Sequence, residues 1–234
     1  ALGFNIIIEA IAKLILGIFF VFIGWKVYGA LFAFIISIFF AYFISFISLT
    51  DILKAKEKPA LTPNIYGYGR NVFISVITVF AFYSIDIIFA RIVFSPEIAG
   101  YYSIASMLSK ALFWGTQPIS KALFPLSAQT EKKRESGLYG KALILLIVAI
   151  LGALIFISLF SSQIIYLFSG KNIPQAAGIL IYLCLATGIL GITNLNLLYK
   201  LSMGSIRHSF VLPVFILIEG ILLYSFSSNL MQFS

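Results

Sequence analysis

Residues 94–110 read FSPEIAGYYSIASMLSK and separate two long apolar stretches of the chain. Ser95 is a residue type that caps helix N-termini, Pro96 suits the first helical position, and Glu97 complements the positive end of a helix dipole. The segment therefore predicts a tight turn followed by a helix. The predicted helix contains Lys110, and the sequence around this lysine is so apolar that its charge should lie deep in a membrane.

The composition indicates an integral membrane protein. Of 234 residues, 61% are hydrophobic and only 10% are charged, and the mean hydropathy is +1.07. Soluble domains are about half apolar and about a quarter charged. The apolar runs are long, which is typical of helices, whereas membrane barrels give short alternating segments. The chain starts at Ala1 almost inside an apolar run, so we expect a fragment of a longer protein.

The apolar runs predict an all-α integral membrane protein, a polytopic bundle of about seven transmembrane helices. Each run is close to the roughly 20 residues that cross a bilayer core. The predicted spans are residues 5–25, 27–49, 71–94, 97–124, 142–160, 174–199 and 210–226. Residues 163–168 are apolar but short, and we expect them to lie at an interface or to extend the fifth span.

The positions of Lys and Arg predict the orientation, because cytoplasmic loops are enriched in both. Ten basic residues fall in loops on one predicted side: Lys54, Lys56, Lys58, Arg70, Lys132, Lys133, Arg134, Lys141, Lys200 and Arg207. Three fall on the other: Lys26, Arg91 and Lys171. We therefore expect the first side to face the cytoplasm in the inner or plasma membrane. The net charge of +8 then reflects topology, and no nucleic-acid partner is implied.

The longest polar stretch divides the chain. Residues 50–70 contain Pro59, Pro63, Gly67 and Gly69, which disfavour a helix. We expect a cytoplasmic linker here, with two helices before it in residues 1–49 and five after it in residues 71–234.

Besides Arg91 and Glu97, which lie at the outer ends of the third and fourth spans, six charged residues fall inside the predicted spans: Glu9, Lys13, Asp86, Lys110, Lys121 and Glu219. A charge at the bilayer centre costs about 2.5–3.5 kcal/mol even on a lenient scale, so such residues normally face a bundle interior or a cavity. Glu9 and Lys13 have the i, i+4 spacing of a helix ion pair. That pair either neutralises itself near the cytoplasmic end of the first span or lines a cavity.

The fourth predicted span carries three polar residues on one face. Lys110, Gln117 and Lys121 share that face, and Pro118 should kink the helix before Pro125 ends it. Lys121 is close enough to the cytoplasmic end to extend to the lipid headgroups. Lys110 is too deep for this, and we expect it to face a polar interior.

Two intramembrane acids have alternative interpretations. Asp86 is either a structural partner of Arg91 or Lys110, or a site for a coupling ion such as H+ or Na+. Glu219 either exchanges a proton, because burial favours the neutral carboxyl, or forms an ordinary hydrogen bond between helices.

The sequence holds few of the groups that catalysis needs. It has one histidine, His208, no cluster with metal-ligand spacing, no nucleotide-binding loop and no Ser-His-Asp set. The single cysteine, Cys184, lies in an apolar run and reads as a small buried side chain. Polar residues scattered over several spans suit a substrate path better than a catalytic site. We therefore expect neither an enzyme nor a cofactor.

Around the third and fourth spans the sequence resembles a known family. The strings SIDIIFARIVFSPEIAGYYSIASMLSK, residues 84–110, and PISKALFPLSA, residues 118–128, are similar to polysaccharide-transporter flippases of the multidrug/oligosaccharidyl-lipid/polysaccharide exporter superfamily. The matching positions are Asp86, Pro96, Glu97, Ala99, Gly100, Tyr102, Pro118, Ile119, Ser120, Phe124 and Pro125. The resemblance is strong over about forty residues and identifies the family but not the glycan.

The resemblance implies a two-lobe exporter fold of twelve to fourteen helices, of which this chain would hold helices five to eleven. Residues 1–49 would be the last two helices of the N-terminal lobe. It further implies a flippase that moves isoprenoid-diphosphate-linked oligosaccharide outward by alternating access while the lipid tail stays among the membrane lipids. Under this hypothesis, Lys110 offers a positive charge to the diphosphate.

The sequence leaves three other interpretations of the function open. A drug or organic-cation antiporter of the same superfamily would line its cavity with acids and aromatic side chains. An integral-membrane enzyme of glycan assembly would normally need a larger loop outside the membrane than residues 50–70 provide. A scaffold subunit that transports nothing is the third.

Overall fold

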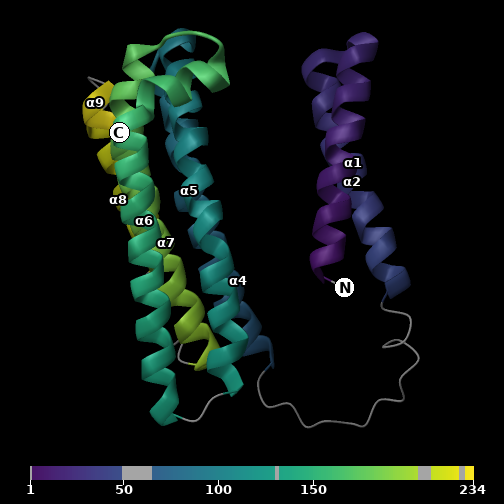
Figure 1. The fold of residues 1–234 in the computed structure, drawn as a ribbon, viewed down its shortest axis with the longest axis vertical. Helices are drawn as coiled ribbons and strands as arrows, with labels where there is room; N and C mark the ends of the chain where they lie inside the picture. The colour runs from purple at the N-terminus through teal and green to yellow at the C-terminus, as the bar shows by residue number, and fades with distance from the viewer. Residues whose placement is uncertain (1, 49–64, 130–131, 205–211, 227–229) are drawn as a thin grey trace. The chain divides into compact units, whose positions relative to one another are not determined.

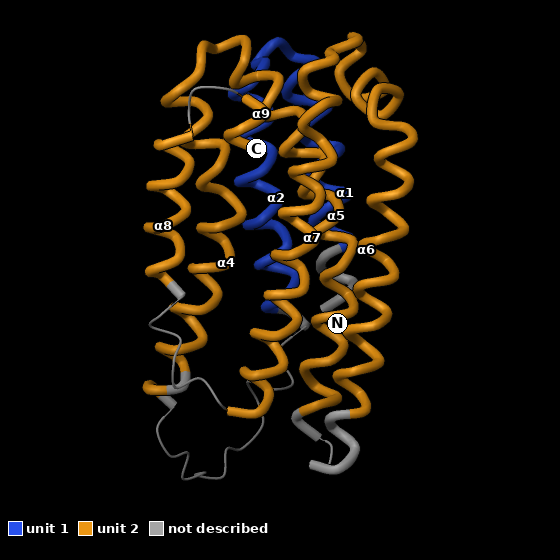
Figure 2. Tube along the Cα trace, turned by 90° about the vertical axis from the view of Figure 1, so that its left-hand side faces the viewer, with its two compact units in different colours: residues 1–62 blue, residues 63–234 orange. Residues whose placement is uncertain are grey.

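The computed structural model describes residues 2–48, 65–129, 132–204, 212–226 and 230–234, and these residues form helices without any strand. This confirms the all-α prediction. Contacts divide the chain into two compact units, residues 1–62 and 63–234 (Figure 2). The division falls inside the predicted linker, most of which lies outside the described residues.

The first unit is a helical hairpin. α1 (Leu2–Phe20) leads through a short π-helical segment, η1 (Val21–Trp25), into α2 (Lys26–Ser48), which packs back against α1 (Figure 1). The chain reverses where Gly24 has a φ of 99°, a left-handed value that glycine adopts without strain. Small buried residues at four-residue spacing, Ala33, Ser37 and Ala41, face the packing seam. Such residues let membrane helices approach closely.

The second unit holds the longer helices. They are α4 (Ile65–Val93), α5 (Pro96–Gln129), α6 (Lys132–Ser169), α7 (Pro174–Ser202), α8 (Leu212–Ser225) and the short α9 (Leu230–Phe233). α5 packs most extensively against α7 and also against α6, while α4 lies against α8 and α5 and touches α7 only briefly (Figure 1). α5 is therefore the central helix of this unit.

Several helix ends differ from the prediction. α4 begins at Ile65, inside the predicted linker, and α6 begins at Lys132. α6 also continues beyond a kink at a non-helical residue, Phe160, so residues 163–168 form the helical segment after that kink. The prediction that Pro125 ends its helix is wrong, because α5 continues through both prolines to Gln129. Proline is tolerated in membrane helices when neighbouring helices support the freed backbone groups.

Four segments of the described chain are long and apolar enough to cross a membrane: Ile7–Phe46, Gly69–Val93, Gly137–Ser169 and Pro174–Ser202. The first of these contains both helices of the hairpin. α8 is apolar but shorter, with Pro213–Ser225 as its apolar part. α5 has the length but is too polar, because it carries many buried hydroxyl side chains, among them Ser106, Ser109 and Thr116. Interfaces between membrane helices are enriched in small and hydroxyl side chains, so a helix packed against several others need not be apolar all round.

Two glycines bring α7 close to its neighbours. A methyl group added at Gly188 would lie 2.8 Å from Ile150 of α6, and one added at Gly191 would lie 3.0 Å from Thr116 of α5. The hydroxyl of Thr187 also donates to the carbonyl of Ser109, at 3.1 Å. α7 therefore packs too tightly at these points to admit a larger residue.

Candidate functional site

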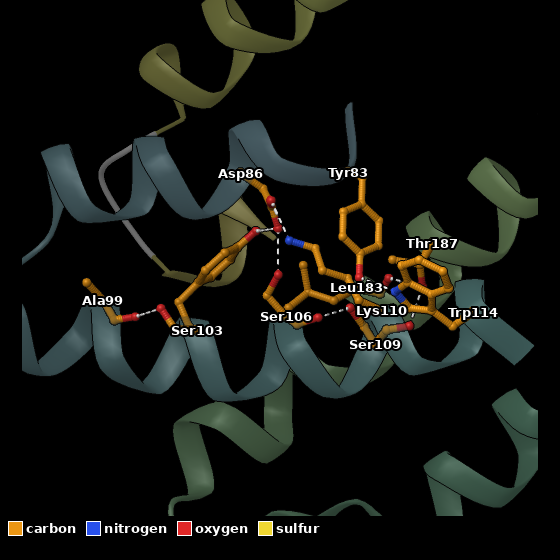
Figure 3. A network of polar contacts seen from close by, with 11 residues as sticks. Tyr83, Asp86, Ala99, Ser103, Ser106, Ser109, Lys110, Trp114, Leu183 and Thr187 are labelled. Carbon is orange, nitrogen blue, oxygen red and sulfur yellow. Dashed lines mark hydrogen bonds and ion pairs between the residues drawn. The ribbon is translucent and has the colours of Figure 1, made fainter. Parts of the chain in front are cut away.

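The two intramembrane charges Asp86 and Lys110 meet inside the second unit. Lys110 Nζ lies 2.9 Å from Asp86 Oδ1, and the two side chains are only 8% and 15% exposed (Figure 3). The pair joins α4 to α5. Of the interpretations open for Asp86, the structure thus places this acid with Lys110.

Asp86 receives two further hydrogen bonds from the same face of α5. Ser106 Oγ donates to Asp86 Oδ2 at 2.7 Å, and the Tyr102 hydroxyl donates at 3.3 Å. Tyr102, Ser106 and Lys110 are spaced four residues apart, which aligns them along one side of the helix. Figure 3 shows Ser106 and Lys110 on the side of α5 that faces Asp86. The carboxylate is therefore held by three donors, which offset the cost of burying it.

The Lys110 ammonium is also covered by an aromatic ring. Its Nζ lies 4.9 Å from the centre of the Tyr83 ring, a distance at which a cation is attracted by the ring face. The Tyr83 hydroxyl accepts a 2.7 Å hydrogen bond from Trp114 Nε1 (Figure 3). Lys110 is thus buried, paired and covered, and little of its charge remains free for another anion.

A cavity of about 150 Å³ adjoins this pair, and we call it the charged cavity. Asp86, Lys110, Tyr102, Thr187 and Glu219 contribute to its lining, together with apolar residues. Glu219 Oε2 is buried and has no hydrogen-bond partner among the described residues. Three helices, α4, α5 and α8, therefore bring two acids and one lysine to a single cavity.

A second cavity of about 200 Å³, which we call the Lys121 cleft, lies between α4, α5 and α7. Its polar lining consists of Tyr83, Trp114, Gln117, Lys121 and Asn194, and the rest is apolar. Tyr83 lines both cavities, so they adjoin. Lys121 is exposed and forms no ion pair with any residue that the structure describes, whereas the Asn194 side-chain nitrogen is buried and lacks a partner there.

Residues 2–177 match the family model described as polysaccharide biosynthesis protein. The chain belongs to this family. No curated protein and no solved structure matches the chain. The family match includes Asp86, Lys110, Gln117 and Lys121, whereas Asn194 and Glu219 lie beyond it.

Membership of the polysaccharide biosynthesis family, with the apolar helices, makes this a membrane protein related to polysaccharide synthesis. This agrees with the resemblance seen in the sequence. In the described part of the chain, no group of three or more His, Cys, Asp or Glu side chains is arranged to hold a metal ion.

Glu9 and Lys13 belong to the first unit and form their own pair. Lys13 Nζ lies 3.0 Å from Glu9 Oε1, and about a third of each side chain is exposed. The same nitrogen lies 4.3 Å from the centre of the Phe34 ring on α2. The i, i+4 pairing expected from the sequence is therefore present.

The sequence did not indicate a site role for five residues that shape the site: Tyr83, Tyr102, Ser106, Trp114 and Asn194. Tyr102 stood out only as a position of the family resemblance. The spacing of Tyr102, Ser106 and Lys110 was a usable signal, since it aligns two hydroxyls with the lysine. Aromatic residues make up 16% of the chain, so Tyr83 and Trp114 did not stand out. Asn194 carries no charge and has no motif around it.

Proposed function

We propose that the protein acts in polysaccharide biosynthesis as a flippase. It would move isoprenoid-diphosphate-linked oligosaccharide from the cytoplasmic to the outer leaflet of the inner or plasma membrane by alternating access. The supporting observation is that charged and polar side chains from separate membrane helices converge on two adjoining cavities. Intramembrane polar residues arranged in this way mark substrate or ion paths.

The charged cavity suits a coupling role within this proposal. Asp86 and Glu219 both line it, and only one lysine, Lys110, is present there to balance them. A proton or Na+ would supply the missing positive charge. Such a cation could alternate with Lys110 as the partner of a carboxylate, linking ion movement to the separation of α4 from α5.

The same two acids are the observation that favours a second candidate, a drug or organic-cation antiporter. An organic cation would be attracted to Asp86 and Glu219 as a coupling ion would. The family favours the flippase, because it is a family of polysaccharide biosynthesis proteins.

The test uses the intact protein in a strain that lacks its own flippase. Wild type, Lys110→Ala, Lys110→Arg and Asp86→Asn are compared at matched protein levels, with Lys200→Gln as control. Lys200 is exposed in the last turn of α7 and lines neither cavity. Surface glycan and lipid-linked precursor are both quantified.

For a flippase, wild type and Lys200→Gln restore surface glycan, whereas Lys110→Ala and Asp86→Asn lose it and accumulate precursor on the cytoplasmic side. Lys110→Arg retains part of the activity. An enzyme of glycan assembly would instead change the amount or structure of the precursor. A wild-type protein that leaves surface glycan absent but confers drug resistance would refute the flippase and support the antiporter.

A further inference from the structure

The Lys121 cleft combines a mainly apolar wall with a lysine that has no ion-pair partner among the described residues. Gln117 and Lys121 lie one helical turn apart on α5, and Asn194 faces the cleft from α7. The opposite wall is apolar and includes Val76 and Val79 of α4. A wider hollow of about 360 Å³ shares Val76 and Lys121 with the cleft. The polar groups are thus gathered where α5 meets α7.

The two lysines of α5 differ in what surrounds them. Lys110 is buried and bonded to Asp86 at 2.9 Å, so its charge is neutralised within the protein. Lys121 is exposed and forms no ion pair with the described side chains. An anion that enters this region therefore meets its available positive charge at Lys121 and not at Lys110.

The Asn194 amide is the second, independent sign of a ligand. The residue is only 8% exposed, and its side-chain nitrogen has no hydrogen-bond partner among the residues described. Leaving a buried donor unpaired costs free energy, so native proteins usually supply a partner. An acceptor bound in the cleft would supply it. Phosphate and sugar oxygens are both acceptors of this kind.

These features fit an amphiphile with an anionic head and a hydrocarbon chain. We propose that the cleft binds the lipid diphosphate of the cargo, with the diphosphate at Lys121, oxygens near the pyrophosphate or first sugar at Asn194 and Gln117, and the first isoprene units against α4. This inference rests on the proposed flippase function and names where its substrate is held. Lys121 lies toward the end of α5 that the basic loops place in the cytoplasm, so this is a loading site.

Farnesyl diphosphate is the probe, and its binding to the intact purified protein is measured by calorimetry in a neutral detergent. Farnesol tests the need for the diphosphate, inorganic pyrophosphate the need for the hydrocarbon, and short-chain phosphatidic acid tests whether an ordinary phospholipid fills the cleft. The variants are Lys121→Gln, Lys121→Arg and Asn194→Leu, with Lys200→Gln as the matched exposed lysine.

We expect Lys121→Gln to weaken farnesyl diphosphate binding about tenfold, because a charge-assisted contact to phosphate is lost. Lys121→Arg should stay within about threefold of wild type, since the charge remains. Lys200→Gln should bind like wild type, and farnesol, pyrophosphate and phosphatidic acid should each bind at least about tenfold more weakly than farnesyl diphosphate. Asn194→Leu should weaken the binding of farnesyl diphosphate, but this variant should still bind farnesyl diphosphate more tightly than farnesol. Because Lys121 is exposed, its variants should keep the wild-type melting temperature, so the test does not depend on Asn194→Leu folding.

Equal losses in Lys121→Gln and Lys200→Gln would overturn the inference, since any surface lysine would then serve. Binding of phosphatidic acid or farnesol as tight as that of farnesyl diphosphate would overturn it too, because the cleft would then be a general lipid site. If the intact protein restores surface glycan while these binding results are negative, the loading site is wrong and the flippase stands. If binding is as expected but wild type restores no glycan, the proposed function fails.

Discussion

The Asp86–Lys110 pair gives the sharpest test of how the second unit is held together. Two unit charges 2.9 Å apart attract by about 6 kcal/mol at an effective dielectric constant of about 20. Much of this offsets the cost of removing both charges from water. Removing one partner of a buried pair typically costs about 3–5 kcal/mol, whereas replacing both is often close to neutral. The pair should therefore show strong coupling and a small net effect.

We predict that Lys110→Met lowers the free energy of unfolding by about 3–5 kcal/mol, since it leaves Asp86 with only hydroxyl donors. Asp86→Asn should cost less, because Glu219 lines the same cavity and remains as an acid for Lys110. The double variant should lie within about 2 kcal/mol of wild type. Unfolding is followed in mixed micelles by titration with a denaturing detergent, which yields the three differences for a double-mutant cycle.

A hydroxyl pair on α5 provides the control. Ser106 donates to Asp86, whereas Ser103 donates to the carbonyl of Ala99 in its own helix. Ser106→Ala should cost about 1.5–3 kcal/mol, as expected for a hydrogen bond to a charged group, and Ser103→Ala about 1 kcal/mol or less. If the costs of Lys110→Met and Asp86→Asn simply add in the double variant, the pair is not coupled and this account of the charged cavity is refuted.

Two other predictions test the packing and the orientation. Gly188→Ala should destabilise the protein by about 1–2 kcal/mol, because the added methyl group would lie 2.8 Å from a side chain of α6. Gly178→Ala in the same helix meets nothing within 4 Å and should stabilise the protein by up to about 1 kcal/mol. Equal effects of the two variants in detergent-titration unfolding would contradict the close packing of α7 against α6. In right-side-out membrane vesicles, an impermeant maleimide should label Lys171→Cys directly and Lys141→Cys only after permeabilisation. Cys184 is buried and should add no background labelling. The reverse labelling pattern would show that the predicted orientation is wrong.

Much of the fold could be predicted because membrane helices are recognised in a sequence by the length and the apolar character of their segments. Each predicted span overlaps an observed helix, and most helix ends differ from the predicted ones by one or more residues because hydropathy alone had set the predicted ends. α4 and α6 extend into polar sequence, which hydropathy cannot recognise as helical. Pro125 misled the prediction because a proline's cost depends on the neighbouring helices, which the sequence does not place.

The candidate site was predictable only as far as its charges. Asp86, Lys110 and Glu219 stood out because charges are rare in apolar spans, but several pairings were open to each of them. To predict that Asp86 pairs with Lys110, one must know how α4 and α5 are shifted along their axes relative to each other. That shift is set by the turn between the two helices and by their packing. Lys110 is paired with Asp86, whereas Lys121 has no ion pair with any side chain that the structure describes, although both lie on the same helix. This difference likewise depends on the tertiary structure.

The tight contact between α5 and α7 has a mechanical consequence. Gly191 against Thr116 and the Thr187–Ser109 hydrogen bond hold α7 closely against α5. α4 touches α7 only briefly, and it carries Asp86 as well as one wall of the Lys121 cleft. Any outward displacement of α4 would therefore widen the cleft and lengthen the Asp86–Lys110 contact in the same movement. The width of the apolar cleft and the length of the Asp86–Lys110 ion pair thus both depend on the position of one helix, α4.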